Sequence, residues 1–139
     1  MIHGRCLCGK VNYQIDGPVG PISFCHCSSC RRASGSAFAA NANVAAADFR
    51  LLTGRDALQE FESSPGKFRS FCSGCGSPIY ARRADLPDTL RIRAGTLLDD
   101  PGSRPTQHFD VASKAVWFTI TDDLARNELP APFHRREAD

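Results

Sequence analysis

Three cysteines within six residues, Cys25-His26-Cys27-Ser28-Ser29-Cys30, constrain the fold of this chain more than any other feature of its sequence. Two cysteine pairs accompany them, in Cys6-Leu7-Cys8-Gly9 and Cys72-Ser73-Gly74-Cys75-Gly76. Seven cysteines cannot all pair as disulfides, but they can divide into a group of four and a group of three. Because zinc binds thiolates in closed four-ligand sites and in open three-ligand sites, this division predicts two metal sites of different kinds.

The two cysteine pairs, Cys6 with Cys8 and Cys72 with Cys75, each run into a glycine. A chain that curls tightly around a metal needs a positive φ at that point, which glycine adopts without strain. We therefore predict that these four thiolates bind a structural zinc ion. Since the unfolded chain has no such site, metal binding would contribute to folding. The alternative is that the four are reduced thiols of the core.

The group of three, Cys25, Cys27 and Cys30, lacks a glycine of this kind. Three local thiolates leave a fourth coordination position for water or a ligand, which is typical of a catalytic zinc ion. A thiol that coordinates such a metal is deprotonated. The group therefore suits activation of a thiol substrate. A fourth protein ligand, either His26 or His108, would instead make it a second structural site.

The composition is that of an ordinary globular domain. The 139 residues suit a single domain, and 42% of them are hydrophobic and 23% charged. The net charge of +2 is too small to predict nucleic-acid binding, which needs clustered Lys and Arg. No apolar stretch has the length of a signal peptide or of a membrane span. We therefore expect a cytoplasmic protein in a reducing compartment, where close-set cysteines bind metal more often than they form disulfides.

Short alternations of apolar and polar residues, separated by glycine and proline, predict a mostly β domain over residues 1–128. The expected strands cover 11–15, 37–44, 49–53, 58–62, 90–95 and 115–120. Residues 68–71 lead into the second cysteine pair, and residues 78–81 lead out of it. The strands on either side of Thr53-Gly54-Arg55-Asp56 are expected to form a hairpin.

Three other segments are expected to lie outside strands. Residues 31–36 are polar and contain glycine, which predicts a loop. Residues 122–128 could form one short helix. Residues 129–139 are polar and interrupted by prolines, so we expect a loose tail.

The cysteines and their neighbours resemble the glutathione-dependent formaldehyde-activating enzyme family, whose domain also occurs in centromere protein V. The resemblance covers roughly residues 3–118 and rests on Gly4-x-Cys6-x-Cys8-Gly9-x-Val11, Cys25-His26-Cys27-Ser28-x-Cys30-Arg31, Ser34-Gly35, Phe71-Cys72-x-x-Cys75-Gly76-Ser77-Pro78, Gly95-Thr96-Leu97, His108 and Ser113-Lys114-Ala115-x-Trp117. Two positions depart from the family pattern. Leu98 is an extra residue before Asp99-Asp100-Pro101, and Val116 stands where the family has proline.

The resemblance implies a β-tent architecture, similar to the Mss4-like fold, with two zinc ions per chain. Position by position, the family's structural zinc ligands match Cys6, Cys8, Cys72 and Cys75. Its catalytic ligands match Cys25, Cys27 and Cys30, whose zinc could be labile. The resemblance further implies a carbon-sulfur lyase-type enzyme that adds glutathione or a related thiol to formaldehyde and gives S-hydroxymethylglutathione.

The residues that would bind the thiol substrate are less constrained. Glutathione carries two carboxylates, which Arg31, Arg32 or Lys114 near the cluster could bind. The proton donor is open among His26, His108 and Lys114. A non-catalytic zinc-containing thiol-binding or interaction module is an alternative, and so is a redox sensor that releases zinc on oxidation. The expected partner is a small-molecule thiol, not nucleic acid or a membrane, and a homodimer stays open.

Overall fold

The computed structural model describes residues 1–131 and is mostly β, which confirms the predicted fold class. The strands are β1 (Ile2–Arg5), β2 (Asn12–Ile15), β3 (Ile22–Cys25), β4 (Ala39–Ala45), β5 (Phe49–Thr53), β6 (Leu58–Ser64), β7 (Lys67–Cys72), β8 (Pro78–Arg83), β9 (Leu86–Arg93), β10 (Pro105–Phe109) and β11 (Ala125–Arg126). The helical segments are α1 (Ser28–Ser34) and the 3₁₀ turns η1 (Ala46–Asp48), η2 (Ala94–Thr96) and η3 (Val111–Ser113).

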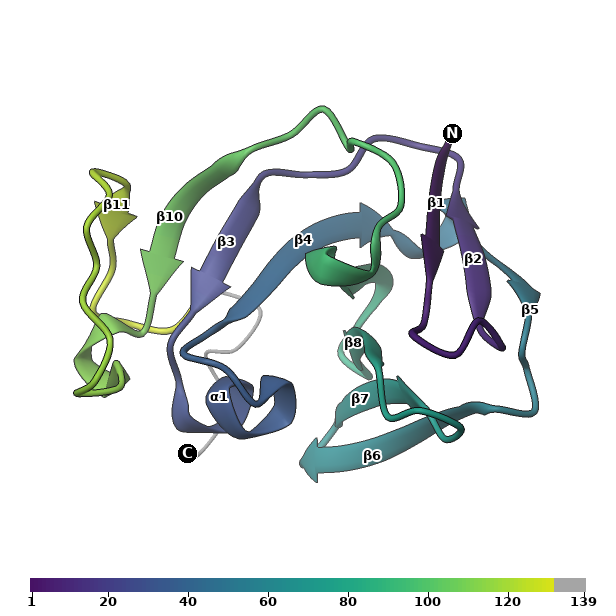
Figure 1. The fold of residues 1–139 in the computed structure, drawn as a ribbon, viewed down its shortest axis with the longest axis horizontal. Helices are drawn as coiled ribbons and strands as arrows, with labels where there is room; N and C mark the ends of the chain where they lie inside the picture. Colours follow the sequence, from purple (N-terminus) through teal and green to yellow (C-terminus); the bar gives the residue numbers. More distant parts are fainter. Residues whose placement is uncertain (132–139) are drawn as a thin grey trace.

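The strands form two sheets. The larger has eight strands in the order β11-β10-β3-β4-β9-β8-β7-β6, and the smaller has three in the order β1-β2-β5. Strand β10 runs parallel to both β3 and β11, whereas the other neighbours are antiparallel. In Figure 1 the large sheet runs from β11 on the left to β6 and β7 at the lower right, with the small sheet beside it and α1 at the lower edge.

The main core lies between the two sheets. Val11, Tyr13 and Ile15 are fully buried, so the predicted alternation over residues 11–15 marks the side chains that β2 and the residue before it turn toward the core. The large sheet packs against them with a second set of apolar side chains, which includes Val44, Cys72, Ile79, Leu90 and Ile92. Burial of these side chains is the main favourable contribution to folding.

The packing in this core is tight at Gly4 of β1, which pairs with Tyr13. A Cβ atom added at Gly4 would lie 2.0 Å from Cζ of the Tyr13 ring. We expect Gly4→Ala to lower the free energy of unfolding by about 2–3 kcal/mol, because the buried ring must shift to make room. Gly95→Ala is the matched control, since nothing lies within 4 Å of its added Cβ. Equal melting temperatures for the two variants would contradict this packing.

The hairpin predicted around residues 53–56 is wrong, although both of its strands exist. Strand β5 pairs with β2 in the small sheet, and β6 pairs with β7 in the large one. Gly54, at φ 89°, lets the chain leave one sheet and enter the other. The hairpin forms one turn later, between β6 and β7, where Gly66 has φ 78°.

The predictions for the segments outside the sheets also need correction. Residues 31–36 are not a loop, because α1 extends to Ser34 and ends at Gly35 in a left-handed conformation with φ 64°. A seven-residue helix is too short for a 3.6-residue apolar period to show in the sequence. Residues 122–128 contain no helix but the short strand β11, which pairs with β10.

The strand predicted over 115–120 is also wrong. The N–H of Phe118 donates to the carbonyl of Ala115 and closes a turn, and Val116 and Trp117 are 98% and 70% exposed. High β propensity alone does not make a strand where no neighbouring strand pairs with it. Val116 and Leu98, the two departures from the family pattern, both lie exposed on the surface.

Most of the predicted tail, 129–139, lies outside the described residues. At its start the carbonyl of Leu129 accepts a hydrogen bond from the N–H of Asp110, and Ala131 is buried. The boundary at residue 128 stays a prediction. In the described part of the chain, no helix has the length and apolar character needed to cross a bilayer.

Candidate functional site

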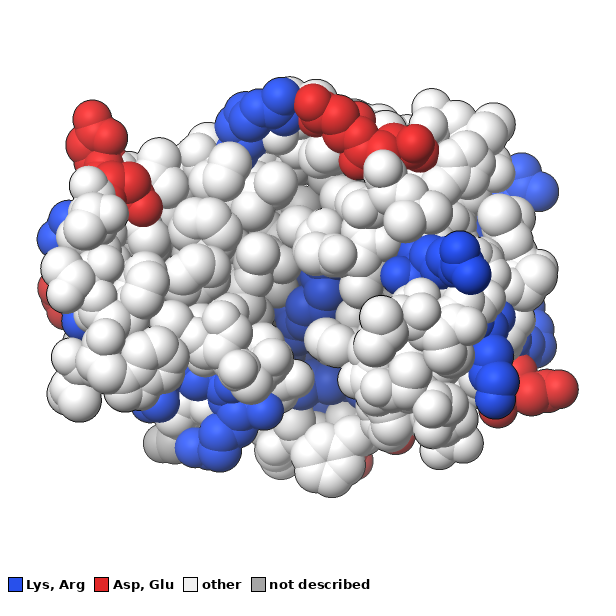
Figure 2. Space-filling view, viewed as in Figure 1, with Lys and Arg blue, Asp and Glu red and all other residues white. Residues whose placement is uncertain are grey.

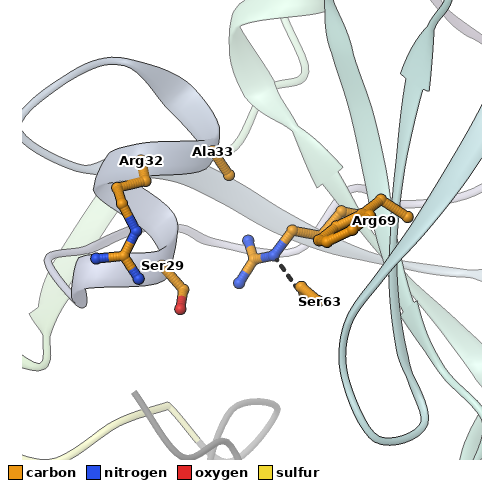
Figure 3. Close-up of a pocket in the computed structure, with 6 residues that line it drawn as sticks. Ser29, Arg32, Ala33, Ser63 and Arg69 are labelled. Carbon is orange, nitrogen blue, oxygen red and sulfur yellow. Dashed lines mark hydrogen bonds between the residues drawn. The ribbon is translucent and has the colours of Figure 1, made fainter.

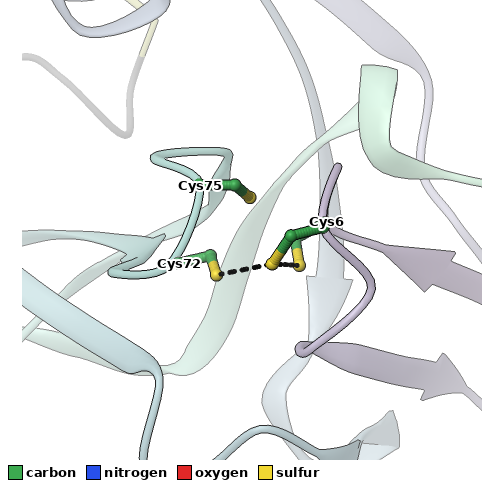
Figure 4. Close-up of side chains that lie close together, drawn as sticks. Cys6, Cys72 and Cys75 are labelled. Carbon is green, nitrogen blue, oxygen red and sulfur yellow. Dashed lines mark hydrogen bonds between the residues drawn. The ribbon is translucent and has the colours of Figure 1, made fainter.

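The structure brings the four cysteines of the predicted structural site together, as Figure 4 shows for Cys6, Cys72 and Cys75. The four sulfur atoms lie within 4.8 Å of one another. The Sγ of Cys8 lies 3.6 Å from that of Cys6 and 3.7 Å from that of Cys72. Because Zn–S bonds are about 2.3 Å long, the sulfurs of a tetrahedral site lie about 3.8 Å apart. The donor set and its spacing therefore fit zinc.

Two turns place these sulfurs. Gly9 and Gly76, which follow the two cysteine pairs, have φ of 83° and 80°, and this confirms the predicted role of glycine. In the first turn the N–H of Val11 donates to the Sγ of Cys6 at 3.2 Å. Such a bond stabilises a thiolate, so this contact favours the ionised form of Cys6 that a metal requires.

Ser77 connects the two turns and was not found by sequence analysis. Its Oγ accepts a hydrogen bond from the N–H of Leu7 at 2.9 Å and lies 3.2 Å from the Sγ of Cys75. Hydrogen bonds from the Ser77 side chain and backbone, the largest contributions, lower the pKa of Cys75 to about 5. Its position in the motif Cys75-Gly76-Ser77 was the only signal that the sequence offered.

The structure also brings together the group of three, whose sulfurs lie within 4.8 Å of one another. Cys25 ends β3, Cys27 precedes α1, and Cys30 lies within α1; all three are at most 1% exposed. The neighbouring sulfurs of Cys25 and Cys30, and then burial, raise the pKa of the Cys27 thiol far above its ordinary value. Three buried thiols this close do not ionise together unless a cation joins them, so this donor set also fits a divalent metal.

No fourth Cys, His, Asp or Glu joins the group of three within residues 1–131. The two histidines considered as a fourth ligand bond each other instead: Nε2 of His26 lies 2.8 Å from Nδ1 of His108. Nε2 of His108 in turn lies 3.0 Å from Oδ1 of Asp122. Burial, the largest cause, and the nearby His108 lower the pKa of His26 to about 4. These three residues form a hydrogen-bonded chain that ends at the 41% exposed side chain of Asp122.

A cavity opens beside the buried cysteines, between α1 and the strands β6 and β7. It has a volume of about 290 Å³, and its walls include Arg32 and Arg69. The Nη1 of Arg69 lies 3.8 Å from the Sγ of Cys30, so one side chain reaches from the cavity to the cluster. Figure 2, viewed from the same side as Figure 1, shows Lys and Arg side chains in a hollow near the middle of the molecule.

The predicted substrate residues lie in different environments. Arg32 lines the cavity, as described. Arg31 has a buried Nε, and the Nζ of Lys114 donates to the carbonyls of Ala115 at 3.1 Å and Phe118 at 2.5 Å. Of the three, Arg32 is therefore the residue that the structure places beside open space near the cluster.

Comparison with known proteins gives one family. Residues 1–113, which hold both cysteine groups, match the family model described as glutathione-dependent formaldehyde-activating enzyme. A crystal structure of a Rhodobacter sphaeroides protein is similar, with a TM-score of 0.61 and 23% identity over 75% of this chain and 99% of that one. At this identity the likeness concerns the fold alone. A comparison with curated proteins found no match.

Proposed function

This chain belongs to the glutathione-dependent formaldehyde-activating enzyme family, and from that premise we propose that it is a zinc-dependent enzyme of carbon-sulfur lyase type. It adds glutathione, or a related thiol, to formaldehyde. The thiol sulfur bonds to the carbonyl carbon and the thiol proton ends on the carbonyl oxygen, which gives S-hydroxymethylglutathione. The observation that supports this most is the buried group of three cysteines beside a basic cavity.

The two cysteine groups have different proposed roles. Cys6, Cys8, Cys72 and Cys75 hold a structural zinc ion, and Cys25, Cys27 and Cys30 hold a second one. When bound to three thiolates, zinc supplies an open coordination position and lowers the pKa of a thiol that occupies it.

The residues around the group of three provide the remaining functions. The guanidinium of Arg69, 3.8 Å from the Sγ of Cys30, offsets the negative charge of the thiolates. The burial of these sulfurs keeps bulk water from them. The hydrogen-bonded chain from His26 through His108 to Asp122 leads from the fully buried interior to a partly exposed carboxylate. This chain is our candidate route for the proton that the product oxygen gains.

Exchange NMR of formaldehyde and glutathione tests the proposal. We expect the native protein to accelerate the exchange above the spontaneous rate, and Cys27→Ser at the same concentration to leave it at that rate. Because thiols add to formaldehyde unaided, the spontaneous rate must be measured in the same buffer. Equal rates with and without native protein would contradict the enzyme. Retained glutathione binding in that case would indicate the alternative, a non-catalytic zinc-containing thiol-binding module.

A further inference from the structure

The cavity beside α1 is bordered by cationic and hydroxyl groups from both of its walls. Ser29 and Arg32 project from α1, while Ser63 of β6 and Arg69 of β7 lie opposite, as Figure 3 shows. The Nε of Arg69 donates to the Oγ of Ser63 at 3.0 Å, which fixes one edge of its guanidinium. A group that enters between α1 and β7 therefore meets two guanidinium groups and two hydroxyls.

A second cavity of about 190 Å³ adjoins the first. The two share Ala33, Phe61 and Arg69, and the second also reaches Arg93 of β9. Three arginines thus line these two adjoining cavities, and none of the described residues that line them is acidic. The local charge is strongly positive although the whole chain carries only +2. Such a site favours anionic ligands.

The two arginines that line the second cavity, Arg69 and Arg93, are held in place. Arg69 and Arg93 are only 8% and 6% exposed, and the Nη1 of Arg93 donates to the Oδ1 of Asn41. Buried guanidinium groups with fixed orientation lose little further freedom when they bind a planar carboxylate in the fork geometry. Fixed arginines in a cavity therefore suit a carboxylate better than they suit a neutral group.

We propose that this cavity is a carboxylate subsite, in which Arg32 and Arg69 bind a carboxylate of the thiol substrate while its sulfur reaches the group of three cysteines. This inference rests on the proposed function, since it supposes a thiol at that cluster. It adds a selectivity: thiols that carry a carboxylate bind, and neutral thiols of similar size bind weakly. Arg69 links the cavity to the cysteines, because its side chain lines the cavity and also contacts the Sγ of Cys30.

Calorimetric titration of the zinc-loaded protein tests the subsite with four probes: glutathione, its dimethyl ester, 2-mercaptoethanol and S-methylglutathione. The native protein should bind glutathione at least tenfold more tightly than the dimethyl ester. Arg32→Ala should weaken glutathione binding about fivefold and leave 2-mercaptoethanol unchanged. Arg69→Lys keeps the positive charge but loses the two-pronged geometry of the guanidinium, so it should weaken glutathione binding about tenfold. Arg50→Ala is the control, since Arg50 is an exposed residue of the small sheet.

The fourth probe separates this inference from the proposed function. S-methylglutathione keeps both carboxylates but has no free thiol. If S-methylglutathione binds the native protein and Arg32→Ala weakens that binding, the subsite is supported. This holds even if the protein does not accelerate the addition of glutathione to formaldehyde. Equal affinity of the native protein for glutathione and its dimethyl ester would overturn the subsite. The subsite would also be overturned if Arg32→Ala weakened the binding of 2-mercaptoethanol as much as the binding of glutathione, because the substitution would then act through the structure and not through a carboxylate.

Discussion

Cys72→Ser is expected to produce a largely unfolded, aggregation-prone protein. Cys72 is fully buried, and its Sγ lies 3.7 Å from that of Cys8 in the group of four. A structural zinc contributes about 10–16 kcal/mol of apparent binding free energy in small zinc peptides. The net stability of a whole domain is only about 5–15 kcal/mol. Loss of one of the four thiolates should therefore remove a large part of the stability, and far-UV circular dichroism with thermal melting measures it.

The matched control for this variant is Ser73→Ala, in the same turn. Ser73 is exposed, and its backbone N–H, which donates to the carbonyl of Ala57, is unaffected by the change. We expect it to melt like the native protein. A strong chelator added to native protein should reproduce the Cys72→Ser melting curve. A soluble Cys72→Ser protein with native melting and native zinc content would show that the group of four is not a structural metal site.

The grouping of the cysteines could be predicted from the sequence because each half of the site is local. Cys6 and Cys8 lie in one turn and Cys72 and Cys75 in another, and each turn carries its own glycine signal. The two pairs are far apart in the sequence, but this did not prevent the prediction. A zinc site with four thiolates needs four cysteines, and each pair supplies only two. Local chemistry thus predicted a long-range contact.

Strand pairing could not be predicted in the same way. The residues of β5 and β6 have the expected pattern, but nothing in them tells which neighbour each strand takes. Pairing depends on which sheet buries the apolar face of each strand, and this is decided by the whole fold. The segment 115–120 has strand-like composition and forms a turn for the same reason.

Of the arginines that line the two cavities, Arg32 was predicted and Arg69 and Arg93 were missed. Arginine is rarely buried, so the alternating pattern of their strands suggests that these side chains face solvent. Arg91 and Arg93 alternate with Leu90 and Ile92 in β9, yet both arginines are less than 10% exposed. Their hydrogen-bond partners come from the neighbouring strand β4: the Oδ1 of Asn43 accepts from Arg91 and the Oδ1 of Asn41 accepts from Arg93. Sheet register, which the sequence alone did not reveal, places these groups together.

Cys27→Ser, in contrast to Cys72→Ser, is expected to stay folded while it loses one zinc ion and its affinity for thiols. Cys27 is the N-cap of α1, and its Sγ accepts the N–H of Cys30 at 3.3 Å. Serine is among the preferred N-cap residues, so its hydroxyl can replace this hydrogen bond. The change removes a thiolate ligand and keeps the cap. Elemental analysis should give two zinc ions per native chain and one per variant chain, with melting temperatures within about 5 °C of each other.

Cys27→Ala separates the two roles of this residue, because alanine supplies neither the thiolate nor the cap. It should lose the same zinc ion and a further ~1 kcal/mol of stability relative to Cys27→Ser. If Cys27→Ser unfolds as Cys72→Ser does, the group of three is a structural site, and the proposal that its metal has an open coordination position is wrong. If it keeps two zinc ions, Cys27 is not a ligand. Only a folded variant with one zinc and no thiol binding agrees with a metal site that Cys25, Cys27 and Cys30 build for a substrate.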